Sequence, residues 1–103
     1  MMTVMCDIYL DSKEDINDTL DTIMNTLIKC NYALIHTRYA TYAESNKEPI
    51  VVTIYNTGQE FITISITSEN DDNALDLCRR MLREIKYKTY LIRHLKHGEK
   101  CSC

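Results

Sequence analysis

The chain has little of several residue types, and each shortage narrows what the protein can be. Its 103 residues include two glycines, one proline and no tryptophan, which leaves little room for linkers or for a glycine-rich phosphate-binding loop. No apolar run approaches the roughly 20 residues that a membrane-spanning helix needs, and the first residues lack the apolar segment of a signal peptide. We therefore expect a single intracellular domain in the cytoplasm, with a nuclear location left open.

Cysteine is more frequent, but its number and placement do not indicate disulfides. The chain has five cysteines, an odd number, whereas a disulfide framework is typical of small secreted proteins with paired cysteines. Three of them fall on expected apolar faces, where a free thiol packs as a small hydrophobic group: Cys6, Cys30 and Cys78. We expect these thiols to be free.

Two histidines and two cysteines lie near the C-terminal end: His94, His97, Cys101 and Cys103. Imidazoles and thiolates are ligands of tetrahedral zinc, so a metal site is one interpretation. A Cys-x-Cys pair at the end of a chain is not a usual zinc arrangement, and thiols on an exposed tail oxidise readily. We favour the tail, and we predict no metal and no cofactor. Residues 97–103 are expected to be a flexible extension of one domain at residues 1–96.

The clearest structural pattern is a strand–turn–strand unit at residues 50–67. Residues 50–55 are β-branched or aromatic throughout, which suits a pleated, half-buried surface. Residues 56–59 contain the asparagine and glycine of a tight turn, and residues 61–67 alternate apolar and polar side chains with a period of two. This pattern predicts a hairpin with one buried face.

Two other segments have the spacing of amphipathic helices. The first covers about residues 13–30, and its early acidic residues suit a helix N-terminus. The second follows a segment at 68–72 whose side chains can cap a helix. Because Leu91 and Leu95 extend its i, i+4 pattern, we prefer a continued helix over a further strand at 88–96.

The remaining segments complete a mixed fold. Residues 3–10 alternate and predict a first strand, and residues 32–42, aromatic and β-branched, predict another before a polar loop at 43–48. The order β-α-β-β-β-α predicts an α+β two-layer sandwich. Its sheet is expected to be mainly antiparallel, with both helices on one face.

Basic residues gather toward the C-terminal end of a chain whose net charge is −3. From Arg79 to Cys103 there are eight lysines and arginines and two acids, so the rest of the chain is strongly acidic. Clustered cations bind phosphate backbones, and the alternative is a solvated helix end whose cations suit the helix dipole. We predict that a nucleic acid or a nucleic-acid-containing assembly contacts Arg79, Arg80, Arg83, Lys86, Lys88 and Arg93.

The uncovered face of the predicted sheet is the second candidate site. It is expected to present threonine and aromatic side chains, so it is neither strongly charged nor fully apolar. One interpretation is a contact surface, either for a second copy or for a nucleic acid that stacks on Tyr55 and Phe61, and of these a protein contact is favoured because few cationic groups lie near. The alternative is an ordinary wet sheet face. The residues predicted for this contact are Tyr9, Thr53, Tyr55, Phe61 and Thr63.

No motif indicates catalysis. The sequence has no nucleophile elbow and no phosphate loop, and His36 is better interpreted as a surface histidine than as a general base. We expect a non-enzyme with no small-molecule substrate and no membrane partner. The favoured function is a binding module that docks on a ribosome- or transcription-associated assembly through its last helix. The alternative is a dimeric or heteromeric protein–protein interaction subunit that uses the sheet face.

The predicted order of elements resembles three families. It resembles the bacterial-type ribosome hibernation factors, with residues 73–76 (Asn-Ala-Leu-Asp) at the start of their second helix and a basic run after it. It is similar to one half of the TATA-binding protein, whose hairpin would correspond to residues 54–59. It is also similar in order and size to the small dimerising subunit of the KEOPS tRNA-modifying complex. These resemblances imply binding to a ribosome, to DNA or to a protein complex, and they transfer no residue role because they are topological.

Overall fold

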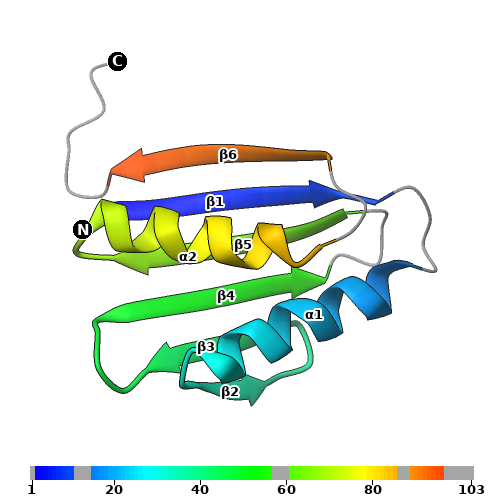
Figure 1. Ribbon diagram of the computed structural model, residues 1–103, viewed down its shortest axis with the longest axis horizontal. Coiled ribbons are helices and arrows are strands. Elements are labelled where there is room, and N and C mark those ends of the chain that lie inside the picture. Colours follow the sequence, from blue (N-terminus) through cyan, green and yellow to red (C-terminus); the bar gives the residue numbers. More distant parts are fainter. Residues whose placement is uncertain (1, 11–14, 57–60, 86–88, 97–103) are drawn as a thin grey trace.

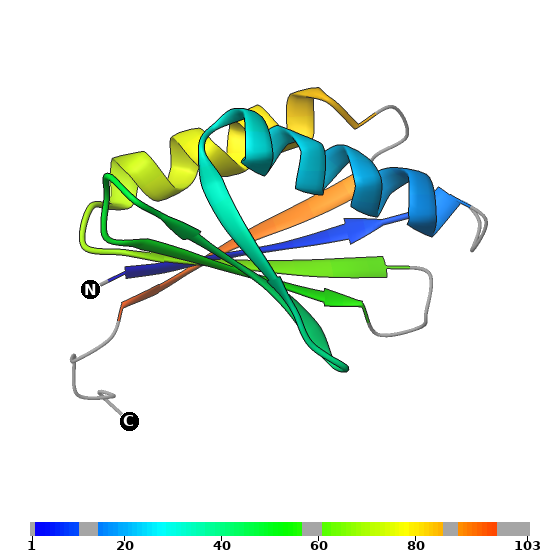
Figure 2. The ribbon, with the colours of Figure 1, turned by 90° about the horizontal axis from the view of Figure 1, so that it is seen from below.

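Six antiparallel strands form a single sheet, and two helices cover one of its faces (Figure 1). The computed structural model describes residues 2–10, 15–56, 61–85 and 89–96. The elements are β1 (Met2–Tyr9), α1 (Asp15–Lys29), β2 (Tyr32–His36), β3 (Ala40–Ser45), β4 (Ile50–Asn56), β5 (Phe61–Ser68), α2 (Asp71–Arg83) and β6 (Thr89–Lys96). The strand order is β2-β3-β4-β5-β1-β6. Because both helices lie on the same side of the sheet (Figure 2), the predicted α+β two-layer architecture is confirmed.

The β4–β5 hairpin supplies the centre of the core. Val52 pairs with Ile66 and Ile54 with Ile64, and all four side chains are buried under the helices. β1 then pairs with β5 so that Cys6 lies opposite Ile64. Each fully buried aliphatic side chain contributes about 2 kcal/mol of hydrophobic stabilisation. The face of the hairpin that carries these side chains is therefore the face that the helices cover.

The helices bury their apolar stripes against these strands. Ile23 of α1 and Met81 of α2 are fully buried. α1 ends where Asn31 takes a φ of 67°, a left-handed conformation that asparagine tolerates better than most residues. α2 begins after Asn70, whose side chain accepts a hydrogen bond from the Asn73 backbone N–H at 3.2 Å. The cap predicted within residues 68–72 is therefore present.

The segment predicted as one strand at 32–42 is two strands, so that part of the prediction is wrong. β2 ends at His36, and β3 begins at Ala40. Thr37 closes the turn between them, because its backbone N–H and its hydroxyl both donate to the Ala40 carbonyl, at 2.9 and 2.8 Å. β3 continues to Ser45, which replaces the start of the loop expected at 43–48. A turn made by threonine, without glycine or proline, leaves no strong signal in the sequence.

The predicted continuation of the last helix is also wrong, because α2 ends at Arg83 and β6 follows. The helix tightens at its end, where the Glu84 N–H donates to the Met81 carbonyl at 3.2 Å. β6 then pairs with all eight residues of β1. Pairing with the otherwise open edge of β1 outweighs the helical spacing of Leu91 and Leu95. The extra strands also change the order of elements on which the three family resemblances rest.

Some sequence predictions lie outside the described residues. These are residues 57–59 of the predicted turn, residues 13–14 of the first predicted helix, Lys86, Lys88 and the tail at 97–103. Neither described helix is long and apolar enough to cross a membrane.

Candidate interaction surface on the open sheet face

The sheet face that the helices leave uncovered carries many exposed apolar side chains. Side chains alternate along a strand, so the neighbours of buried core residues point to this face, which we call the open face. Nine large hydrophobic side chains are exposed within the described residues, and six of them belong to the open face: Tyr9, Ile35, Tyr42, Val51, Tyr55 and Leu91. Each of the six is between 37% and 51% exposed. Such a gathering is typical of a contact surface.

The strand register aligns these side chains in rows across the sheet. One row takes a residue from every strand: Ile35, Tyr42, Thr53, Ser65, Met5 and Arg93. The next row contains Tyr55, Thr63, Asp7 and Leu91. Side chains directly opposite each other on neighbouring strands have Cβ atoms about 5 Å apart. The exposed apolar groups therefore lie on one continuous sheet face from β2 to β6, where they are interspersed with threonine, serine and the Asp7–Arg93 pair.

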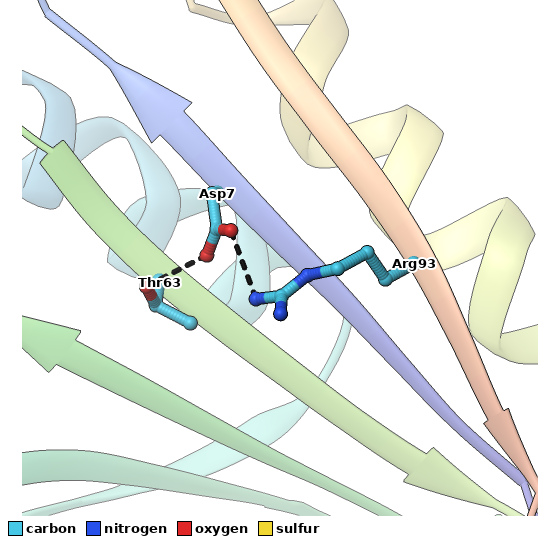
Figure 3. A network of polar contacts seen from close by, with 3 residues as sticks. All are labelled: Asp7, Thr63 and Arg93. Carbon is cyan, nitrogen blue, oxygen red and sulfur yellow. Dashed lines mark hydrogen bonds and ion pairs between the residues drawn. The ribbon is translucent and has the colours of Figure 1, made fainter.

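A charged pair links three strands on the open face (Figure 3). Arg93 Nη2 donates to Asp7 Oδ2 at 2.9 Å, and Thr63 Oγ1 donates to Asp7 Oδ1 at 2.8 Å. The Asp7 side chain is 11% exposed, whereas that of Arg93 is 47% exposed. Because the carboxylate is neutralised and both its oxygens accept hydrogen bonds, this part of the face adds little unpaired charge that a partner must desolvate.

All five residues predicted for the sheet-face contact lie on the open face. Tyr9 and Tyr55 are exposed, and the Tyr9 ring centroid lies 5.9 Å from that of Phe61, within the range of favourable aromatic pairs. Thr53, Phe61 and Thr63 are half-buried. The structure thus brings these residues together on one surface, while their role in binding stays a prediction.

Several members of the open face were not predicted from the sequence. Ile35 and Tyr42 belong to the two strands that were predicted as one, so their facing was not assigned. Leu91 was placed on a helix. Asp7 and Arg93 were not connected because they are 86 positions apart. The sequence signal for a strand there is the run of Tyr90, Leu91 and Ile92, which is compatible with a strand as well as with a helix.

The basic residues predicted for nucleic-acid contact do not share one surface. Arg79, Arg80 and Arg83 are exposed on α2, which lies on the covered side of the sheet (Figure 2). Arg93 lies on β6, on the open face, and is held by an ion pair. The two lysines of the prediction are outside the described residues. Within the described chain, the predicted basic helix therefore carries three of the six residues.

The predicted histidine–cysteine group falls mostly outside the described residues. His94 lies on β6, while His97, Cys101 and Cys103 are not described. In the described ranges, no group of three histidine, cysteine, aspartate or glutamate side chains is placed to hold a metal ion. His36 Nδ1 lies 3.1 Å from the hydroxyl of its cross-strand neighbour on β3, which gives this histidine a structural contact.

The three cysteines that the structure describes have free thiols. Cys6 and Cys78 are buried between sheet and helix, where a hydrogen bond to Cys78 and burial both raise the pKa of the Cys6 thiol. Cys30 is half-buried, and its sulfur accepts a hydrogen bond from Arg80 Nη1 at 3.4 Å. Beside it, burial and the nearby Glu48 carboxylate raise the pKa of Tyr32 to about 12. Both residues line a cleft of about 240 Å³.

Comparison with known proteins supports the fold alone. No family model matches the chain, and no curated protein matches its sequence. Among solved structures, the chain is similar to the crystal structure of the adenosylmethionine decarboxylase from Aquifex aeolicus, with a TM-score of 0.61 and 10% sequence identity. The match covers 98% of this chain and 92% of that one. At this identity, the similarity shows that the two chains share an α+β sandwich built on an antiparallel sheet.

Proposed function

We propose that the protein is a non-catalytic interaction subunit that pairs with a second copy of itself through the open face. The observation that carries this proposal is the gathering of six exposed apolar side chains on one face of the sheet. The other face is already covered by helices, so the fold has one unpartnered layer (Figure 2). The free thiols within the described residues suit the reducing cytoplasm.

The size of the open face supports a stable pair. The molecule extends 40 × 35 × 27 Å along its principal axes, and the sheet is seen face-on when viewed down the shortest axis (Figure 1). A standard protein interface buries about 800 Å² on each partner, which fits within a face of these dimensions. Two sheets packed face to face lie about 10 Å apart with interdigitating side chains. The exposed valine, isoleucine, leucine and tyrosine side chains of the open face can interdigitate in this way.

The charge on the open face favours a like copy over a nucleic acid. Arg93 is engaged by Asp7, so a phosphate backbone would have to compete with a carboxylate for it. Two copies related by a two-fold axis each present this neutralised pair, so Asp7 and Arg93 add little net charge to the interface. Burial of the surrounding aromatic and aliphatic side chains then provides the driving force for association of the two copies.

Sedimentation velocity ultracentrifugation of the purified chain tests this proposal. The wild-type chain is expected to sediment as a dimer, and Ile35→Glu or Tyr55→Glu is expected to release monomers because each puts a charge into the apolar interface. Ile28→Glu is the matched control: Ile28 is 54% exposed on α1, against 51% for Ile35. A monomeric wild-type chain, or a dimer that Ile28→Glu splits as readily as Ile35→Glu, would contradict the proposal.

A second candidate function rests on the three exposed arginines of α2. Arg79, Arg80 and Arg83 belong to one helix and stay accessible when the open face is occupied. Clustered arginines bind phosphate groups in a sequence-independent way, which suits docking on a ribosome- or transcription-associated assembly. The test is sedimentation of the tagged chain from its native lysate. Migration with heavy particles that ribonuclease abolishes supports this function, and a light peak that ribonuclease leaves unchanged contradicts it.

A further inference from the structure

A groove between the helices has a chemistry that the open face does not use. The N-terminal half of α1 lies beside the C-terminal end of α2 (Figure 1), and residues of both line a cavity of about 380 Å³, a volume typical of ligand sites. Its described lining contains no lysine or arginine and four carboxylates: Asp15, Asp18, Asp21 and Glu84. We call this cavity the acidic groove.

Thr19 lines the acidic groove, and its buried side chain has a hydroxyl without a partner among the described residues. The residue is 7% exposed, and within the described residues its hydroxyl makes no hydrogen bond. Other threonines of α1 behave differently: the hydroxyl of Thr22 donates to the Asp18 carbonyl at 2.9 Å, and that of Thr26 donates to the Thr22 carbonyl at 2.8 Å. A buried hydroxyl without a partner lowers stability. That cost is recovered when a ligand in the groove bonds to it.

The charges of the acidic groove are not explained by helix capping alone. Asp15 and Asp18 lie in the first turn of α1, where negative charge is favourable. Glu84 lies at the C-terminal end of α2, where the helix dipole favours cations and disfavours a carboxylate. Asp21 lies beyond the first turn of α1. At least two of the four carboxylates therefore gain nothing from their own helix.

We propose that the acidic groove binds arginine side chains of a basic peptide segment in a partner protein. Asp15, Asp18 and Asp21 follow one another along α1 in steps of about 4.5 Å, a row on the order of 9 Å long. They are spread out, and in the described chain no three such groups are placed to hold a metal ion. Side chains on one side of an extended peptide repeat about every 6.7 Å. Two arginines of such a peptide can therefore contact the row of carboxylates at the same time.

The guanidinium group fits the hydrogen-bonding groups of the acidic groove. It carries five N–H donors in a planar fork, and the groove offers carboxylate oxygens from two helices together with the Thr19 hydroxyl as acceptors. A lysine ammonium has three donors on a compact charge and cannot bridge as many acceptors. The site therefore favours arginine over lysine.

Fluorescence anisotropy with the full chain tests the acidic groove. The probe is a labelled peptide in which arginines alternate with serines, and the matched peptide has glutamine at every arginine position. Asp21→Asn combined with Glu84→Gln is expected to weaken binding of the arginine peptide about tenfold. The control removes two exposed acids outside the groove, Glu69→Gln with Asp72→Asn, and is expected to change the affinity less than about twofold. Equal losses for the two double variants, or equal binding of the glutamine peptide, would overturn the proposal.

Thr19→Val separates a binding role from a structural one. Valine keeps the shape of the side chain and removes the unpartnered hydroxyl, so the melting temperature is expected to rise. Affinity for the arginine peptide is expected to fall about threefold, because one acceptor is lost. A variant that is stabilised and binds as tightly as the wild type would show that the hydroxyl takes no part in binding, and the proposed site would then be wrong. The open-face variants Ile35→Glu and Tyr55→Glu lie outside the groove and are expected to leave these outcomes unchanged, so the two proposals can fail independently.

Discussion

At the scale of single residues, Asp7 has the most demanding environment on the open face. Its carboxylate is largely buried and depends on Arg93 and Thr63 for its hydrogen bonds. These three residues come from β1, β6 and β5, so the network also holds β6 in register at the edge of the sheet. A buried carboxylate that loses its cation retains the cost of desolvation without the compensating attraction.

Arg93→Met is expected to lower the free energy of unfolding by about 1–2 kcal/mol, less than for a fully buried pair because the Arg93 side chain is 47% exposed. Asp7→Asn removes the charge that Arg93 neutralises. In a double-mutant cycle measured by urea unfolding, the coupling energy of the two changes is expected to be about 1 kcal/mol. Arg79→Met, at an exposed arginine of α2, is the control and is expected to change stability by less than about 0.5 kcal/mol. Additive single effects would show that the pair contributes nothing.

Residues of the open face could be assigned from the sequence where apolar and polar side chains alternate along a strand. They could not be assigned elsewhere. Tyr55 and Phe61 were placed on the correct face because their neighbours Ile54 and Ile62 are apolar in strict alternation. Asp7 was not among the residues predicted for this face, and Arg93 was predicted as a nucleic-acid contact of the last helix. Their contact joins residues 86 positions apart in the chain. No local pattern in a single sequence predicts a contact between residues so far apart.

At the scale of elements, the segments that fold by local pattern were predictable. β5 and α1 each have a clear hydrophobic period, and β4 is a run of β-branched and aromatic residues. Each of the three is present near its expected bounds. β6 was not predictable, because a spacing of four residues is compatible with both periods. Leu91 and Leu95 would share one face of a helix, and they also share one face of a strand. The choice between helix and strand depends on β1, which is distant in the sequence and whose free edge pairs with β6.

The start of α2 depends on the cap that the sequence predicted. Asn70→Ala is expected to lower the free energy of unfolding by about 1 kcal/mol, because the Asn73 backbone N–H loses its acceptor. Asn70→Ser retains an acceptor and is expected to lose little. Asn17→Ala, at an exposed site in α1, is the matched control and is expected to be neutral or slightly stabilising, because alanine is the better helix former. Urea unfolding followed by circular dichroism measures all three, and an equal loss in the alanine and serine variants would contradict the capping role.

At the scale of the whole molecule, two layers leave one face of the sheet without a partner. The helices cover Ile64 and Ile66, while the opposite face leaves Tyr42, Val51 and Tyr55 exposed. Alternation along the strands predicted this division into a covered and an open face. It did not predict how apolar the open face is, because that depends on β2, β3 and β6 lying beside the central strands. The character of the surface is thus a property of strand order, which a single sequence does not specify.

If folded chains pair through the open face, dissociation is coupled to unfolding, and the melting temperature depends on protein concentration. A tenfold increase in concentration is expected to raise the melting temperature of the wild-type chain by about 3 °C, given the unfolding entropy typical of chains of this size. Ile35→Glu is expected to melt at a temperature independent of concentration, whereas Ile28→Glu on α1 keeps the dependence. Calorimetric scans at several concentrations measure the effect. A melting temperature that stays constant with concentration would show that association does not stabilise the folded chain, which would contradict a stable pair built on the open face.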